Sequence, residues 1–279
     1  GKVVATAETD ANGDFIFQPK TEKDLHYTER DAGNTFTYTI SEKAKAGYTP
    51  DDKNPTKVVV SVSDSRSGKL TVTAQYPNAG AYYDESNKED PTPLYNNTYA
   101  ASGSLKLSGK KVVEGRALDK DFKFQLTEVD EDGNPIADKQ PLTATSDHTK
   151  NGAFEFTAID YHKDAQRDDT GYHTYQLTEI SQYPGYTLDQ TSFKNLLKVY
   201  VEDVGDGTLQ VSQIKDSGSR EVLSSGSEKA QYTYFFGEVK NIYHAAGSIT
   251  LKGHKTVNGS ALAAGEKFDF ELKDKNEKV

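Results

Sequence analysis

Cysteine, methionine and tryptophan are absent from this chain of 279 residues. Without cysteine there is no disulfide, no thiolate metal site and no cysteine nucleophile. No apolar run is long enough to span a bilayer. The formal net charge of −10 argues against nucleic acid or an anionic membrane as the main partner. A disulfide-free protein that has to resist force or proteases therefore needs a different staple.

A long stretch of the sequence occurs twice. Gly103–Leu118 (GSLKLSGKKVVEGRAL) matches Gly247–Leu262 (GSITLKGHKTVNGSAL), and each copy is followed by an aromatic alternation, FKFQL or FDFEL. The two copies are 144 residues apart, and the same offset relates YNNTY to VKNIY. Similarly, FTYTISE matches HTYQLTE with an offset of 137 residues. A repeat of this length indicates tandem domains.

The repeat divides the chain into three parts. Residues 101–245 form one complete domain, residues 1–100 the C-terminal half of another, and residues 246–279 the N-terminal part of a further one. We expect head-to-tail assembly, in which residues 246–279 of one copy complete residues 1–100 of the next.

Short runs alternate apolar and polar residues with a period of two, which is typical of strands with one buried face. Examples are FEFTAI, KVYV, VVVSV and LTVT, and they are separated by turn signals such as Asp206-Gly207. Residues 163–169 alone suggest a short turn of helix. The pattern predicts an all-β protein built of tandem β-sandwich domains.

Three polar residues of the complete domain fall within or at the ends of predicted strands: Lys111, Glu179 and Asn241. A buried lysine loses its proton readily and becomes a nucleophile, and a buried glutamic acid can polarise a carboxamide by donating to its oxygen. Together they can form a Lys–Asn amide bond with loss of ammonia and without a cofactor. Because the domain is its own substrate, this is a single-turnover reaction and not enzyme catalysis in the usual sense.

The half domains carry the matching residues separately. Glu42 and Asn97 lie in the N-terminal half, and Lys255 lies in the C-terminal part. A bond between Lys255 of one chain and Asn97 of another is therefore predicted as the covalent form of the assembly.

The order K-V-V-x-G-R-x-L, F-x-F-x-L, Y-x-L-x-E and N-x-Y resembles the isopeptide-linkage domains of Gram-positive pilins and surface adhesins, the streptococcal T-antigen-type major pilins in particular. The resemblance implies an immunoglobulin-like (CnaB-type) sandwich and a covalently locked stalk, extracellular and anchored to the cell wall. It assigns the bond to Lys111 and Asn241 and the promoting role to Glu179. An LPxTG-type sorting signal and a YPK-like pilin motif are both missing from the sequence.

Other interpretations stay open at this stage. Lys106 or Lys110 could face inward in place of Lys111, because a shift of one residue turns a side chain to the other face. The acidic loops 10–14 and 130–138 lack EF-hand spacing, so we interpret them as hairpin loops and expect no metal site. An alternative function is an adhesin module whose long loops bind a host protein or glycan.

Overall fold

The computed structural model describes all residues except 52–53, 78–79, 85–86, 192, 194, 227 and 274–279. Strands dominate the described part, where the helices are two short 3-10 turns, η1 (Glu29–Asp31) and η2 (His148–Lys150). The prediction of an all-β chain of tandem sandwich domains is confirmed. A helix apolar and long enough to cross a membrane was not found among the described residues.

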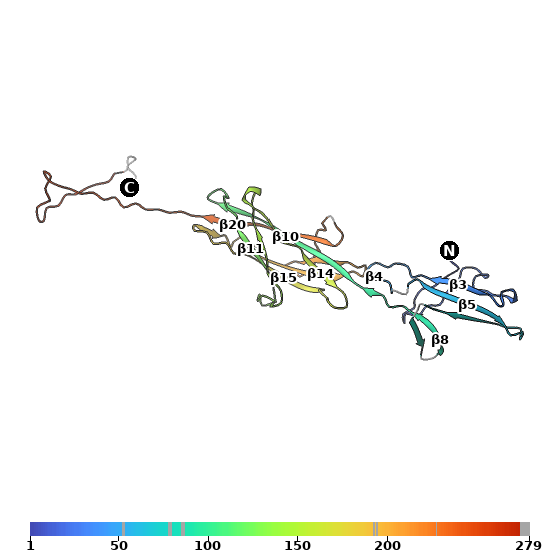
Figure 1. Ribbon diagram of the computed structural model, residues 1–279. Helices are drawn as coiled ribbons and strands as arrows, with labels where there is room; N and C mark the ends of the chain where they lie inside the picture. Colours follow the sequence, from blue (N-terminus) through green and yellow to red (C-terminus); the bar gives the residue numbers. More distant parts are fainter. Residues whose placement is uncertain are drawn as a thin grey trace.

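Two sheets form the middle unit (Figure 1). The first contains β10 (Ala101–Glu114), β13 (Ala153–Glu155), β14 (Ile159–Lys163), β16 (Tyr186–Leu188) and β20 (Gln231–Tyr243). The second has the order β12-β11-β15-β17-β18-β19. Its strands are β11 (Lys123–Val129), β12 (Leu142–Thr145), β15 (Gly171–Glu179), β17 (Leu196–Asp203), β18 (Leu209–Ile214) and β19 (Arg220–Val222).

The core of the middle unit lies between these sheets, because the period-two pattern places every second side chain on the inner face. Leu105 and Leu107 of β10 are fully buried, as are Phe124 of β11 and Leu177 of β15. The Phe124 ring stacks on that of Phe154 with centroids 4.0 Å apart. Aromatic and aliphatic side chains thus fill the space that a disulfide often spans in sandwiches of this size.

Smaller sheets form the N-terminal unit. Its main sheet has the order β3-β5-β6, and three pairs, β1-β2, β4-β9 and β7-β8, lie outside it. The strands are β1 (Ala5–Thr6), β2 (Gln18–Pro19), β3 (Thr35–Ile40), β4 (Tyr48–Thr49), β5 (Thr56–Asp64), β6 (Leu70–Gln75), β7 (Gly80–Asp84), β8 (Asn87–Leu94) and β9 (Thr98–Tyr99).

Residues 246–273 contain no strand, although the sequence predicts that they belong to a sandwich. They extend away from the middle unit on the side opposite the N-terminal unit (Figure 1). A strand needs a partner for its backbone hydrogen bonds, and no described strand of this chain lies beside the segment. The remainder of this predicted part, residues 274–279, lies outside the described residues.

The expected turn of helix over residues 163–169 is wrong. Lys163 ends β14, and the Asp164 carboxylate accepts hydrogen bonds from the backbone N–H groups of Gln166 and Arg167. An aspartate that binds backbone N–H groups two and three residues ahead stabilises a turn instead of a helix interior.

Candidate functional site: a buried lysine, glutamate and asparagine

Lys111 lies on the inner face of β10 and is completely buried. It continues the inward series of Leu105 and Leu107. Lys106 and Lys110 face outward, where they form surface ion pairs with glutamates. The question of which lysine faces the core is therefore answered by the alternation of β10.

Asn241 reaches the same place from the last strand of the unit. β20 runs parallel to β10, with Lys111 paired with Val239 and Val113 paired with Asn241. Val239 and Asn241 are 1% and 2% exposed, so both face the core. Because β10 and β20 are parallel neighbours, the inward side chains of the first and last strands of the unit lie close together.

Glu179 enters from the facing sheet, at the end of β15, and bridges the other two side chains. Its Oε2 accepts a hydrogen bond from Lys111 Nζ at 2.8 Å, and its Oε1 accepts one from Asn241 Nδ2 at 2.7 Å. The Glu179 side chain is only 4% exposed. The three residues predicted from the sequence thus form one connected, buried cluster.

Burial lowers the pKa of Lys111, and the hydrogen bond and charge of Glu179 offset part of this effect. A lysine removed from water favours its neutral amine, which is the nucleophilic form. The amine nitrogen also lies 4.7 Å from the centre of the Phe122 ring, so one side of it is covered by an aromatic face.

The Asn241 Oδ1 atom is buried and has no hydrogen-bond partner among the described residues. An unsatisfied buried acceptor of this kind costs about 1–3 kcal/mol. The sequence argument expects Glu179 to donate to this oxygen, whereas Glu179 here accepts from the carboxamide nitrogen. The carboxylate therefore contacts both nitrogens that would exchange places in an amide-forming reaction.

A groove leads from the surface to this cluster. It is lined by Glu179, Asn241 and the loop before and within β16, including Tyr183 and Tyr186. The Tyr183 and Tyr186 rings make T-shaped contacts with the ring of Phe122, the residue that covers the Lys111 amine. The cluster is thus dry on the lysine side and accessible on the asparagine side.

The N-terminal unit contains the counterparts of two of the three cluster residues, the glutamate and the asparagine. Asn97 Nδ2 donates to Glu42 Oε1 at 2.6 Å, as Asn241 donates to Glu179. Both Glu42 and Asn97 are exposed. Lys255 is not brought to them, and its Nζ instead donates to the backbone oxygen of Thr256.

Sequence reasoning missed a second repeated contact. The hydroxyls of Tyr161 and Tyr175 lie 2.8 Å apart in the core of the middle unit, and those of Tyr27 and Tyr38 lie 2.9 Å apart in the N-terminal unit. Tyr38 and Tyr175 occupy the same position of the repeated FTYTISE and HTYQLTE stretches, which is the signal that could have revealed the pair. Their partners lie in segments with no recognisable repeat.

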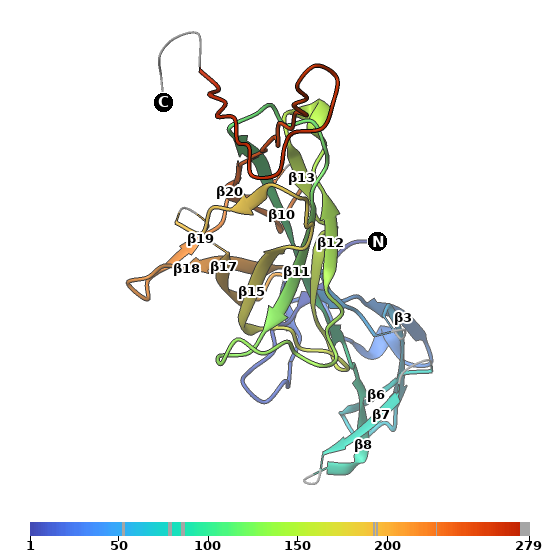
Figure 2. The ribbon, with the colours of Figure 1, turned by 90° about the vertical axis from the view of Figure 1, so that its left-hand side faces the viewer.

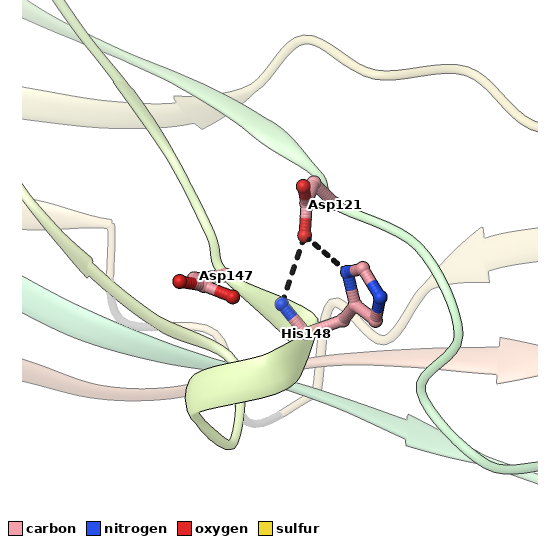
Figure 3. Close-up of side chains that lie close together, drawn as sticks. All are labelled: Asp121, Asp147 and His148. Atoms are coloured by element: carbon pink, nitrogen blue, oxygen red, sulfur yellow. Dashed lines mark hydrogen bonds and ion pairs between the residues drawn. The ribbon is translucent and has the colours of Figure 1, made fainter.

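Asp121, Asp147 and His148 also lie close together (Figure 3). Asp121 accepts from both the backbone N–H and the Nδ1 of His148. The Asp147 carboxylate accepts hydrogen bonds from the backbone N–H and the hydroxyl of Thr149, and in this way Asp147 caps the N-terminus of η2. These bonds explain the cluster as a support for the loop next to Phe122.

Most of the chain matches one protein-family model. Residues 2–100 and 107–234 match the family FctA, described as the Spy0128-like isopeptide containing domain. No protein with curated function matches the chain.

Solved pilus proteins are similar at low identity. The major pilin SpaA of Corynebacterium diphtheriae is 13% identical over 72% of this chain and 41% of its own length, with a TM-score of 0.28. The major pilin T3.2 of Streptococcus pyogenes is 16% identical over 86% of both chains, with a TM-score of 0.23. A C-terminal fragment of the pilus adhesin SpaC of Lactobacillus rhamnosus GG is 15% identical over 88% of this chain and 89% of that fragment, with a TM-score of 0.27. The match of both units to one family profile, together with the buried lysine, glutamate and asparagine, shows that the chain belongs to the Spy0128-like isopeptide-containing domain family.

Proposed function

We propose that this chain is a segment of an extended cell-surface shaft in a Gram-positive bacterium, and that its middle unit is locked by an amide bond between Lys111 and Asn241. The observation that carries the proposal is the Glu179 carboxylate, which contacts both Lys111 Nζ and Asn241 Nδ2 inside the core. The cell-surface location is inferred from the pilus proteins that the chain resembles.

The proposed reaction is balanced without a cofactor. Glu179 takes a proton from the Lys111 ammonium, and the neutral amine attacks Cγ of Asn241. The bond between Cγ and Nδ2 then breaks, and one proton from the former amine and one from Glu179 leave with Nδ2 as ammonium. The products are one secondary amide, one ammonium ion and a Glu179 carboxylate, so the neutral protein is lighter by one ammonia.

Two features of the site favour the reaction: the burial of Lys111 and the fixed positions of its amine and the Asn241 amide. The lowered pKa of Lys111 increases the share of neutral amine at a given pH. Holding amine and amide together in one core replaces an encounter in solution, which is worth roughly 7–11 kcal/mol of the barrier. The groove at Asn241 gives the ammonia a route to solvent.

The position of the bond suits a shaft under tension. The chain enters the unit at the start of β10 and leaves it at the end of β20, and these strands are parallel neighbours. Pulling on both ends would shear one strand past the other. With the bond formed, force passes from Lys111 directly to Asn241, so residues 112–240 carry almost none of it.

Intact mass of the purified chain and tandem mass spectrometry of its tryptic peptides test the proposal. We expect a mass lower by one ammonia for the middle unit and a branched peptide that joins Lys111 to Asn241. Lys111→Met, Glu179→Ala and Asn241→Ala should each restore the full mass. Lys110→Met, which changes the neighbouring outward lysine, should keep the loss. A parent chain with its full mass in the middle unit would refute the bond.

The alternative of a ligand-binding adhesin module stays a prediction. A binding screen against host matrix proteins and glycans, followed by exchange of loops 130–140 and 216–231, would test it. Loss of binding at unchanged stability would favour it.

A further inference from the structure

The two strands that carry the lysine and the asparagine alternate differently. In β10, every second residue faces the core without interruption up to Lys111. In β20, Tyr232 and Phe236 are buried, and both have even numbers. Val239 and Asn241 of the same strand are also buried, and both have odd numbers. Because the side chains of a regular strand alternate with a period of two, β20 must change phase between Phe236 and Val239.

An extra residue in β20 causes this change. The two strands run side by side through the middle unit (Figures 1 and 2). Ser108 is paired with Phe235 and Lys110 with Glu238, so two steps along β10 match three steps along β20. One residue inserted into one strand of a pair is a β-bulge, which is rare between parallel strands. Here the bulge lies between the strands that supply the lysine and the asparagine of the cluster.

Gly237 is the residue that allows the bulge. Phe236 and Gly237 lie opposite the single residue Gly109, and the φ of Gly237 is +91°. Residues with a Cβ rarely adopt such a backbone conformation. A Cβ added to Gly237 would have no described atom beyond its chain neighbours within 4 Å, so lack of space does not explain the glycine. The requirement for glycine at this position is therefore conformational.

The bulge decides which residues of β20 face the core. If the pairing before the bulge continued in step, Lys111 would lie opposite Glu238 instead of Val239. Lys240 would then turn to the core, and Asn241 would turn to the outer face. The asparagine would leave the cluster although no residue of the cluster had changed.

Ion pairs on the outer face agree with the shifted register. Glu238 contacts Lys110, the residue opposite it, at 2.8 Å. Lys240 contacts Glu114 at 3.1 Å and Asp189 at 3.0 Å. Surface pairs of this kind contribute little stability, but the register without the bulge would turn the Glu238 and Lys240 side chains inward and break them. Burial of these charges would disfavour that register.

We propose that Gly237 is a positioning residue for the reaction between Lys111 and Asn241, because its positive φ forms the bulge that turns Asn241 toward Lys111 and Glu179. The consequence for the reaction rests on the amide bond proposed above, whereas the cause lies in the strand geometry alone. Gly237 itself touches none of the reacting atoms in this scheme. It determines whether the carboxamide faces the amine.

Mass spectrometry of matched full-length variants tests this role. Gly237→Val places a β-branched residue at positive φ, and we expect the loss of ammonia over a fixed incubation to fall about tenfold. Gly237→Asn should retain most of the reaction, since asparagine tolerates positive φ better. Gly218, in the β18–β19 turn, has a φ of +79° and equally open surroundings. Gly218→Val therefore introduces comparable backbone strain elsewhere and should keep the bond.

Deletion of Gly237 separates positioning from stability. The deletion removes the extra residue together with the bulge, so the strand would alternate regularly, with Phe236, Val239 and Asn241 inside and Glu238 outside. We expect this variant to form the bond. A role of Gly237 in stability alone predicts that the deletion and Gly237→Val lose the bond alike.

Thiol labelling measures the direction of the strand independently of the bond. Because the chain contains no cysteine, Asn241→Cys and Glu238→Cys each introduce a single thiol. The Glu238 side chain is 57% exposed and Asn241 is 2% exposed, so maleimide should modify Glu238→Cys quickly and Asn241→Cys slowly. Addition of Gly237→Val should reverse this order, and deletion of Gly237 should preserve it.

Two outcomes would overturn the inference. One is a Gly237→Val chain that reacts as fast as the parent and keeps the parent labelling order. The other is a deletion variant that loses the bond and labels rapidly at Asn241→Cys. If Gly237→Val does not fold, the less strained Gly237→Ala provides the same comparison. A parent chain with its full mass would refute the amide bond, whereas the labelling order would still decide the role of Gly237.

Discussion

The two Glu–Asn pairs of this chain have almost the same hydrogen bond and very different surroundings. Glu179 and Asn241 are bonded at 2.7 Å in the core beside Lys111, whereas Glu42 and Asn97 are bonded at 2.6 Å and exposed. Among the described residues, β10, which carries Lys111, and β11, which pairs with the strand of Glu179, have no counterpart beside Glu42 and Asn97. The Glu–Asn contact thus forms in both units, whereas the burial that lowers the pKa of a lysine is found in the middle unit.

The largest effect should come from opening the bond of the middle unit. Asn241→Ala keeps the Lys111–Glu179 ion pair and removes the cross-link. A cross-link that closes a loop of this size stabilises by about 5 kcal/mol in the chain-entropy description. We expect the melting transition of the middle unit to fall on the order of 10–20 °C in calorimetry. Lys110→Met should melt with the parent, and an equal melting temperature for Asn241→Ala would contradict the proposed bond.

The two tyrosine pairs test the same comparison between the units, with a smaller expected loss of stability. Tyr175→Phe leaves the Tyr161 hydroxyl without its partner in a buried site, which should cost about 1–3 kcal/mol. Tyr38→Phe removes the matching contact of Tyr27, which is only partly buried, so water can replace it and the cost should be lower. Urea unfolding of the two variants measures both values. A larger loss for Tyr38→Phe would show that the N-terminal core is better sealed than its exposure indicates.

The pH dependence of the free energy of unfolding distinguishes a Lys111 that still titrates from one that has formed the amide bond. In Asn241→Ala, Lys111 still titrates, and burial lowers its folded pKa below the ordinary value of 10.5. Between these two values the unfolded chain binds more protons than the folded one, so the free energy of unfolding rises with pH. The slope is at most about 1.4 kcal/mol per pH unit.

The matched control for this titration is Asn241→Ala combined with Lys111→Met, which removes the group and leaves all others. Urea titrations of the two variants at several pH values should diverge, with the lysine-containing variant gaining stability as the pH rises. Parallel curves would mean that Lys111 is not perturbed by burial.

The smallest effect is expected at Asn97. Asn97→Ala removes one exposed hydrogen bond to Glu42 and one partly buried hydrogen bond from the backbone N–H of Asp51. Single hydrogen bonds of this kind contribute about 0.5–1.5 kcal/mol each. Unfolding of the N-terminal unit in urea should shift only slightly, in contrast to the effect of Asn241→Ala. A loss as large as that of Asn241→Ala would show that Asn97 has a structural role beyond these two bonds.

The sequence by itself determined the class of the fold and the identity of the three residues that meet in the buried cluster. Period-two alternation identified the strands, and the fixed spacing of the repeat singled out Lys111, Glu179 and Asn241 without knowledge of any contact. It also matched Lys255, Glu42 and Asn97 as separated parts of a second set. Repetition is informative here because two copies under the same chemical constraint keep the same residues at the same strand positions.

Only the tertiary structure decided which lysine faces inward, which atom of Asn241 meets Glu179, and that Phe122 covers the amine. It also decided that the Glu179–Asn241 pair is buried whereas the Glu42–Asn97 pair is exposed. These features depend on the pairing between distant strands and on the packing of two sheets. Backbone hydrogen bonds and dry cores form only when both partners are present in space, and the order of residues along a chain does not specify where the partner comes from.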